Sequence, residues 1–196
     1  MNIEKAMKNL KLRGFEVKLF STGAEASEYI CSQVKNTDVG IGGCKTAEEL
    51  GLFEKLSENN SVYWHWKTPG PETIAKANSA HVYITGANAI SEDGEILNID
   101  GKGNRLAGQV YGDKKVYIIA GTNKLRPDFH SALSRARNIA AVKNCKRFDN
   151  NNPCKIDDSC HDCRMKSRIC NALLVLWGPM MGMDMEVILI DEELGF

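Results

Sequence analysis

Residues 85–105, TGANAISEDGEILNIDGKGNR, place amide, carboxylate and guanidinium side chains directly after an apolar stretch. Asn88 can donate and accept hydrogen bonds through its amide, and Asp100 can accept from hydroxyl groups or act as a general base. Arg105 can hold an anion with two parallel hydrogen bonds. Turn capping also explains these residue types, so a ligand site and a surface loop both remain open. The candidates are Asn88 and Asp100 for catalysis, and Gly86, Asn98, Asn104 and Arg105 for ligand binding.

A second candidate stretch is GIGGCKT, residues 40–46. Gly42 and Gly43 leave a short apolar run, where glycines let backbone amides turn toward an anion. Lys45 and Thr46 follow at the start of a predicted helix. These four residues form a candidate anion cradle, and a plain strand-to-helix turn is the alternative.

A third candidate stretch is AGTNKL, residues 120–125, which ends a very apolar run. Asn123 and Lys124 should therefore lie at the same edge of the molecule as the other two stretches. A solvated lysine is the alternative interpretation, and ligand binding by both residues is the prediction.

Four cysteines lie close together in PCKIDDSCHDCRMKSRIC, residues 153–170. Gathered thiolates favour zinc or an iron–sulfur cluster, and Cys-x-x-Cys is a common chelating pair. The two outer spacings, of five and six residues, match no standard zinc finger. A surface loop with reduced thiols is the alternative. The candidate metal ligands are Cys154, Cys160, Cys163 and Cys170, with His161 expected to stand outside the set.

The elements that must position these residues alternate along the chain. Strands are expected at residues 15–20, 38–42, 61–66, 80–87, 95–99, 114–121, 171–178 and 185–192. Helices are expected near the N-terminus and at residues 23–34, 46–58, 71–80, 103–112 and 126–144. A capping box of Thr46 and Glu49 should open the helix at 46–58. The alternation predicts a three-layer α/β fold: a mostly parallel sheet with helices on both faces.

In a sheet of this kind, ligands bind beyond the carboxyl ends of the strands. The three polar stretches follow different predicted strands. We therefore expect them to converge on one pocket that attracts negative charge.

The composition limits the function classes. The chain has 196 residues with 25 basic and 25 acidic side chains, which argues against a nucleic-acid binder with its usual basic excess. The charged N-terminus does not resemble a signal peptide, and the longest apolar run is too short to span a membrane. The expectation is one cytoplasmic domain over residues 1–196, with a cysteine-rich insert at about 145–171.

Residues 85–125, TGANAISEDGEILNIDGKGNRLAGQVYGDKKVYIIAGTNKL, and residues 132–144, ALSRARNIAAVKN, resemble the LUD domain, the family of lactate-utilisation protein C. The resemblance implies the fold of ribose-5-phosphate isomerase, glucosamine-6-phosphate deaminase and the coenzyme A transferases. It also implies a role in lactate or organic-acid utilisation beside iron–sulfur oxidoreductase subunits. Expected partners are a small anionic metabolite, those iron–sulfur subunits and a second copy of the chain.

The same motif is similar to the pattern of methylthioribose-1-phosphate isomerases, in which an aspartate follows Gly-Ala. This chain has Asn88 at that position, and an amide cannot act as a general base. Three functions therefore stay open: binding of an anionic or phosphorylated ligand, a non-enzymatic accessory subunit, and an isomerase or coenzyme A transferase.

Overall fold

The computed structural model describes residues 1–196, and its centre is a six-stranded sheet in which all neighbouring strands run parallel. The strand order is β1-β10-β7-β4-β2-β3. The strands are β1 (Glu16–Phe20), β2 (Asp38–Ile41), β3 (Ser61–Trp64), β4 (Val82–Gly86), β7 (Lys115–Gly121) and β10 (Asp184–Ile190). Because the strands are parallel, their carboxyl ends share one edge of the sheet.

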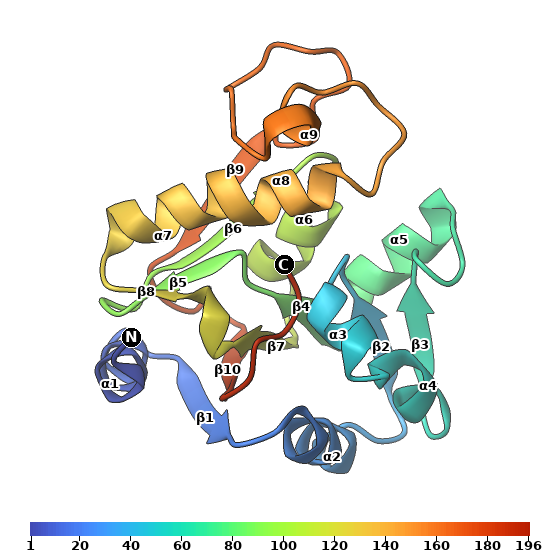
Figure 1. Cartoon of the computed structure of the whole chain (residues 1–196). Helices are drawn as coiled ribbons and strands as arrows, with labels where there is room; N and C mark the ends of the chain where they lie inside the picture. The colour runs from blue at the N-terminus through green and yellow to red at the C-terminus, as the bar shows by residue number, and fades with distance from the viewer.

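Helices cover both faces of this sheet (Figure 1). One face carries α2 (Gly23–Gln33), α3 (Lys45–Glu49) and α4 (Leu52–Ser57). The other face carries α1 (Ile3–Leu12), α5 (Pro71–Ser79) and α6 (Asn104–Val110). No helix of the chain is long and apolar enough to cross a membrane.

The central strands are mostly apolar because both of their faces are covered. In β7, Val116 and Ile118 belong to the buried cluster that contains α1, whereas Tyr117 and Ile119 belong to the cluster that contains α2, α3 and α4. A run without alternation is typical of a parallel strand buried on two sides. The predicted α/β fold, with a mostly parallel sheet between helices, is confirmed.

A second sheet, with strand order β8-β5-β6-β9, was not predicted. Its strands are β5 (Ala89–Ser91), β6 (Ile96–Asp100), β8 (Leu125–Arg126) and β9 (Ala172–Leu176). A hairpin joins β5 to β6, and Gly94 at its tip has a φ of 92°, a conformation that glycine adopts without strain. This sheet brings Asp100, at the end of β6, beside the carboxyl ends of the main sheet.

The outer face of the second sheet is covered by the longest helical run of the chain. It consists of α7 (Phe129–Arg135), a π-helical turn η2 (Ala136–Ala140) and α8 (Ala141–Cys145). Ala132 and Ala136 from this run pack against Ala89 and Leu97 of the sheet. The run ends beside the pocket described below.

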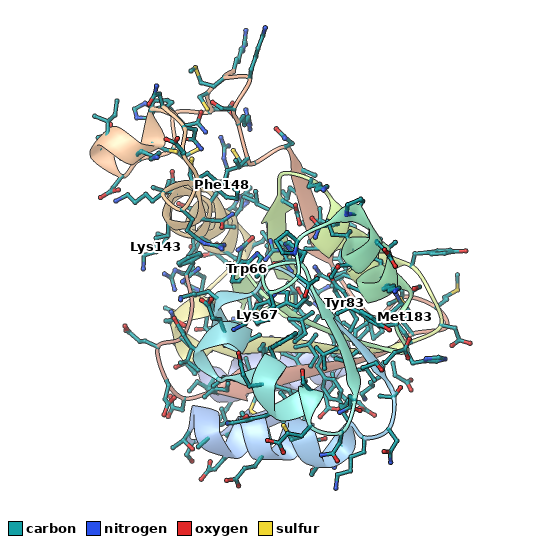
Figure 2. The ribbon with its side chains drawn as sticks, turned by 90° about the vertical axis from the view of Figure 1, so that its right-hand side faces the viewer. Trp66, Lys67, Tyr83, Lys143, Phe148 and Met183 are labelled. Atoms are coloured by element: carbon teal, nitrogen blue, oxygen red, sulfur yellow. The ribbon has the colours of Figure 1, made fainter.

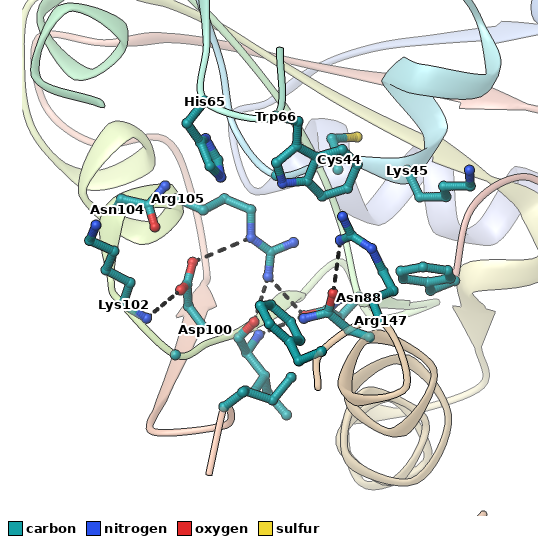
Figure 3. Close-up of a pocket in the computed structure, with 18 of the residues that line it drawn as sticks. Cys44, Lys45, His65, Trp66, Asn88, Asp100, Lys102, Asn104, Arg105 and Arg147 are labelled. Carbon is teal, nitrogen blue, oxygen red and sulfur yellow. Dashed lines mark hydrogen bonds and ion pairs between the residues drawn. The ribbon is translucent and has the colours of Figure 1, made fainter. Parts of the chain in front are cut away.

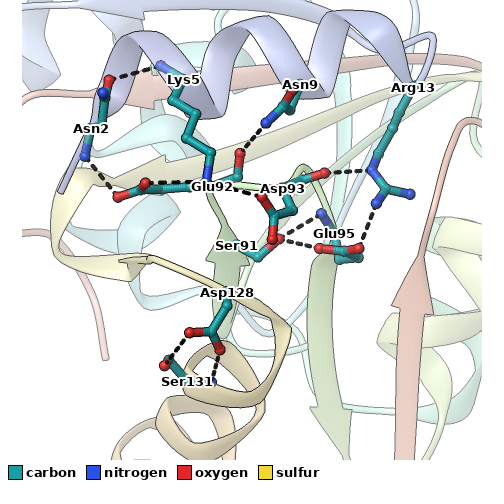
Figure 4. A network of polar contacts seen from close by, with 10 residues as sticks. All are labelled: Asn2, Lys5, Asn9, Arg13, Ser91, Glu92, Asp93, Glu95, Asp128 and Ser131. Atoms are coloured by element: carbon teal, nitrogen blue, oxygen red, sulfur yellow. Dashed lines mark hydrogen bonds and ion pairs between the residues drawn. The ribbon is translucent and has the colours of Figure 1, made fainter.

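Helix α1 is fastened to the hairpin tip by polar contacts (Figure 4). The Asn9 side chain donates to the Glu92 carbonyl at 2.7 Å, and Arg13 Nε donates to the Asp93 carbonyl at 2.7 Å. The Glu92 carboxylate accepts from the Asn2 backbone N–H at 2.8 Å. The amphipathic N-terminal helix therefore holds the second sheet in place as well as covering the first.

The helix expected at residues 46–58 is two helices. Gly51 between α3 and α4 has a left-handed φ of 63°, which interrupts the helical hydrogen bonds. The predicted capping box of Thr46 and Glu49 is wrong, because the N-cap is Cys44, whose Sγ accepts from the Ala47 N–H at 3.4 Å. The pattern matched a capping box two residues downstream of the true helix start.

The strand expected at residues 61–66 ends at Trp64. The backbone N–H groups of Lys67 and Thr68 both donate to the Trp64 carbonyl, at 3.0 and 2.9 Å, so the chain turns there. The turn brings Trp66 back toward the carboxyl ends of the strands.

Gly40 in β2 lies directly against α5. A Cβ atom at this position would lie 2.0 Å from the backbone oxygen of Ala77. Because a backbone atom has little room to move, we expect Gly40→Ala to displace α5 and to lower the free energy of unfolding by about 1–3 kcal/mol. Urea unfolding measures this. Gly43→Ala, whose Cβ would meet the Trp66 ring at 3.3 Å, is the control, and equal losses in both variants would contradict the expectation.

Candidate functional site

A pocket of about 400 Å³ opens at the carboxyl ends of β2, β4 and β7 (Figure 3). All three polar stretches of the sequence analysis reach it. The predicted site residues that line it are Gly43, Lys45, Thr46, Gly86, Asn88, Asp100, Asn104, Arg105 and Lys124. The parallel sheet explains this convergence, since it places the ends of successive strands side by side.

Three predicted site residues lie outside the pocket lining. Gly42 lies beneath it, where a Cβ atom would be 2.8 Å from the Tyr83 hydroxyl. Asn98 is fully buried, and its amide donates to Gln109 Oε1 at 2.9 Å. The Asn123 carbonyl accepts from Arg135 Nε at 3.0 Å. These residues shape the loops of the pocket without facing it.

Arg105, Asp100 and Asn88 form one connected cluster. Arg105 Nε lies 3.5 Å from Asp100 Oδ2, and an Nη of Arg105 donates to Asn88 Oδ1 at 3.1 Å. Asp100 Oδ1 accepts from the backbone N–H groups of Lys102 and Gly103, each at 3.0 Å. Both oxygens of the Asp100 carboxylate are therefore engaged within the protein. The cluster therefore orients the guanidinium, and the catalytic roles of Asp100 and Asn88 stay predictions.

Lys124 lies deep in the pocket and has no counter-ion. The residue is 3% exposed, and its Nζ takes part in no hydrogen bond or ion pair. Burial, with Arg135 nearby, lowers the pKa of Lys124 to about 8. A buried ammonium is costly unless it is paired. An anion in the pocket would supply the missing partner.

The pocket lining is strongly cationic. Its six lysines and arginines face one carboxylate, that of Asp100. The cations are Lys45, Lys102, Arg105, Lys124, Arg147 and Arg168. The positive charge of Lys45 is offset by Glu48, at 2.5 Å, that of Arg105 by Asp100, and that of Arg168 by Asp162, at 3.2 Å. The remaining excess attracts small anions in a partly enclosed space, where charges are weakly screened.

One wall of the pocket was missed by the sequence analysis. It contains His65, Trp66, Arg147, Phe148, Arg168 and Phe196. Figure 2 shows Trp66 below Phe148, where the end of α8 faces the turn after β3. The guanidinium of Arg147 lies 3.8 Å from the centre of the Trp66 ring. His65 and Trp66 close the strand predicted at residues 61–66, whereas Arg147 and Arg168 follow no predicted strand and give no signal in the sequence.

His65 and Cys44 are uncharged members of the lining. Burial and the nearby charge of Lys102 lower the pKa of His65, which favours the neutral imidazole. Burial raises the pKa of Cys44, whose thiol is fully enclosed at the N-cap of α3. A neutral thiol is a poor nucleophile, so Cys44 has a structural place here.

The four cysteines predicted to bind metal come together away from the pocket. They line one small cavity with Cys145 and His161, between α8 and the segment of residues 146–171. Burial and the neighbouring Cys145 raise the pKa of Cys154 to about 11. All seven cysteines of the chain are free thiols, and no three His, Cys, Asp or Glu side chains form a closed ligand set.

Comparison with known proteins gives a family and a fold. A family model for the LUD domain matches residues 3–190. No curated protein matches the chain. Among solved structures, the crystal structure of a DUF162 family protein from Deinococcus radiodurans is similar, with a TM-score of 0.57 at 13% identity, covering 96% of this chain and 95% of that one. At this identity the likeness concerns the fold alone.

Proposed function

The chain belongs to the LUD domain family, and from this premise we propose that it binds a small anionic or phosphorylated metabolite at the carboxyl ends of its strands. The observation that carries the proposal is the unpaired Lys124 ammonium inside the pocket. Burying an ammonium group without a partner costs free energy, and a bound anion would provide the missing partner.

The dimensions and charge of the pocket narrow the class of ligand. A volume of about 400 Å³ lies toward the small end of the range for small-molecule sites, roughly 300–1,000 Å³. This favours a compact hydroxy acid or sugar phosphate over a whole coenzyme A. We connect the ligand with lactate or related organic-acid utilisation, because the LUD resemblance carries that association.

Binding without chemistry fits the pocket better than isomerase or transferase chemistry. The one acidic side chain of the lining, that of Asp100, is held by Arg105 and by two backbone N–H groups. Isomerisation needs a free base, and acyl transfer in this fold needs a free carboxylate nucleophile. An accessory or sensing subunit of an iron–sulfur oxidoreductase would use the same binding site and is the second candidate.

The test replaces Arg105 with alanine. We expect Arg105→Ala to abolish the stabilisation by phosphate, pyrophosphate, lactate or ribose 5-phosphate that the wild type shows in a thermal-shift panel. The variant itself should lose about 1–3 kcal/mol of stability, because the Ile99 carbonyl and Asp100 lose their donor. Lys67→Ala, which removes a cation outside the pocket, is the control and should keep the ligand shifts. Ligand shifts that persist in Arg105→Ala would contradict the proposed site.

A further inference from the structure

The segment of residues 146–171 has almost no apolar support. It contains one helix, α9 (Cys154–Asp157), and no strand. None of its residues belongs to the three buried apolar clusters of the chain. Three of its four larger apolar side chains, Phe148, Ile156 and Met165, are exposed, and the fourth, Ile169, is half-buried. Figure 1 shows the segment as a loop that extends beyond α8. Hydrophobic burial therefore does not hold this segment in one conformation.

Polar links tie the two ends of the segment together around the thiols. Asn152 is buried, and its amide donates to the Ser167 carbonyl at 2.9 Å. Arg168 donates to the carbonyls of Cys163 and Cys170, at 2.8 and 2.9 Å. These links close the segment into a ring whose centre is the cysteine-lined cavity.

The backbone between the cysteines adopts the left-handed conformation at two non-glycine residues. Only three non-glycine residues of the chain have positive φ, and two of them, Asp158 and Asp162, lie in this segment. Asp158 precedes Cys160, and Asp162 lies inside the Cys160-x-x-Cys163 pair, with φ values of 60° and 46°. Left-handed backbone at such residues persists only where the surroundings enforce it. Asp158 is the left-handed C-cap of α9, and the Asp162 carboxylate pairs with Arg137 and Arg168, each at 3.2 Å. A metal bound to Cys160 and Cys163 would hold the same turn between them.

Four cysteine thiols are available to bind a metal, whereas the two other candidate ligands in the cavity, Cys145 and His161, already contact other side chains. Cys145 Sγ accepts from Asn152 Nδ2 at 3.3 Å in the buried end of α8. His161 Nε2 contacts both oxygens of Asp157 at 2.9 Å. The four cysteines of the segment line the cavity, where the guanidinium of Arg137 lies beside Cys160 and the thiol of Cys145 lies beside Cys154. Soft thiolate donors select zinc among the common divalent ions.

Charge around the cavity suits a site of this type. Zinc with four thiolates carries two net negative charges, which need nearby cations. Arg137 places an Nη 3.8 Å from Cys160 Sγ, and Arg168 lines the same cavity. Both guanidiniums also pair with Asp162, each at 3.2 Å, so they would offset part of the negative charge of the complex.

We propose that the segment forms a tetrahedral tetrathiolate site for Zn²⁺, which closes as the thiols move in upon the ion. The ligands are Cys154, Cys160, Cys163 and Cys170. The site is structural, because four protein ligands leave no open position for a substrate. Zinc binding supplies the ordering free energy that the segment lacks. The proposal is independent of the anion pocket.

The experiment uses the full chain, purified without oxygen, and measures metal by mass spectrometry. We expect about one zinc per chain in the wild type, and loss of zinc from Cys160→Ser and Cys163→Ser. Cys31→Ser, in α2 and away from the cavity, is the matched control and should keep its zinc. Replacement of zinc by Co²⁺ in the wild type should give the visible bands of a tetrahedral thiolate complex, so a poorly folding variant does not decide the matter.

A second readout tests the structural role. The segment carries trypsin sites at Lys155, Arg164 and Lys166. Chelation of zinc should make cleavage there at least about tenfold faster while the rest of the chain stays intact. Metal-free protein with four freely reactive thiols, a disulfide, or the absorbance of an iron–sulfur cluster would each overturn the proposal. Equal cleavage with and without chelator would overturn the ordering role.

Discussion

Lys124→Met is expected to abolish anion binding and, at the same time, to make the empty protein more stable. Lys124 is 3% exposed and unpaired, so the wild type bears the cost of burying its charge. The fall of its pKa from 10.5 to about 8 corresponds to about 3 kcal/mol in favour of the neutral amine. Methionine fills a similar volume without that cost. Removing one partner of a buried charge pair should weaken anion binding at least about 30-fold.

The same lysine predicts how stability changes with pH. Its folded pKa lies below its unfolded pKa, so between about pH 8 and pH 10.5 the unfolded chain binds more protons. The stability of the empty wild type should therefore rise with pH through this window. Anion affinity should change in the opposite sense, falling above about pH 8 as the ammonium loses its proton. Both trends should be absent from Lys124→Met.

Urea unfolding and isothermal titration with phosphate measure these two effects separately. Lys67→Met removes a lysine that is paired on the surface with Glu54, and it serves as the control. If Lys124→Met were less stable than the wild type when empty, the ammonium would have a partner within the protein. If it kept its phosphate affinity, the ligand would sit elsewhere.

Arg135→Met is expected to lower the free energy of unfolding and to increase the mobility of the loops that line the pocket. The Arg135 side chain is buried and donates to the carbonyls of Asn88, Asn123 and Phe196. These carbonyls belong to the loops after β4 and β7 and to the stretch after β10. The Asn123 carbonyl keeps a second donor, Arg126, at 3.1 Å. The loss of the bonds to Asn88 and Phe196 should lower the free energy of unfolding by at least about 2 kcal/mol, since each acceptor left unpaired costs about 1–3 kcal/mol.

Urea unfolding and amide hydrogen exchange measure this effect. Exchange should rise in the loops after β4 and β7 and much less in the sheet itself. Lysine at position 135 should restore little, because an ammonium cannot span three separated carbonyls as a guanidinium does. Lys143→Met, an exposed change on the same helical run, is the control. A wild-type unfolding curve for Arg135→Met would show that the loops hold themselves in place.

The sequence was sufficient for the main sheet and for half of the pocket. Runs such as VYIIA in β7 predict strands buried on both faces, and glycines with polar residues after those runs predict the strand ends. One parallel sheet then brings Gly43, Asn88 and Lys124 together without any further information. These predictions depend only on the local sequence pattern and on the rule that parallel strands place their carboxyl ends at one edge of a sheet.

The rest of the pocket could not be predicted, because it depends on how separate elements pack. The second sheet requires β8 and β9, which are far apart in sequence, to join the hairpin. Arg147 reaches the pocket only because the run from α7 to α8 ends there, and Trp66 only because the chain turns after Trp64. The predicted capping box at Thr46 was wrong for a related reason. The N-cap is Cys44, and cysteine is not among the residue types from which a capping box is recognised.

Arg168 lines both the anion pocket and the cysteine-lined cavity. One guanidinium cannot make its full set of contacts in both spaces at once. Ligands in the two spaces therefore either compete for its hydrogen bonds or share its positive charge. By thermodynamic linkage, if a ligand in one cavity changes the affinity of the other cavity for its ligand by some factor, the second ligand changes the affinity for the first by the same factor. Arg168 would thus couple two cavities that share no strand, and titration of each ligand in the presence of the other would give the sign of that coupling.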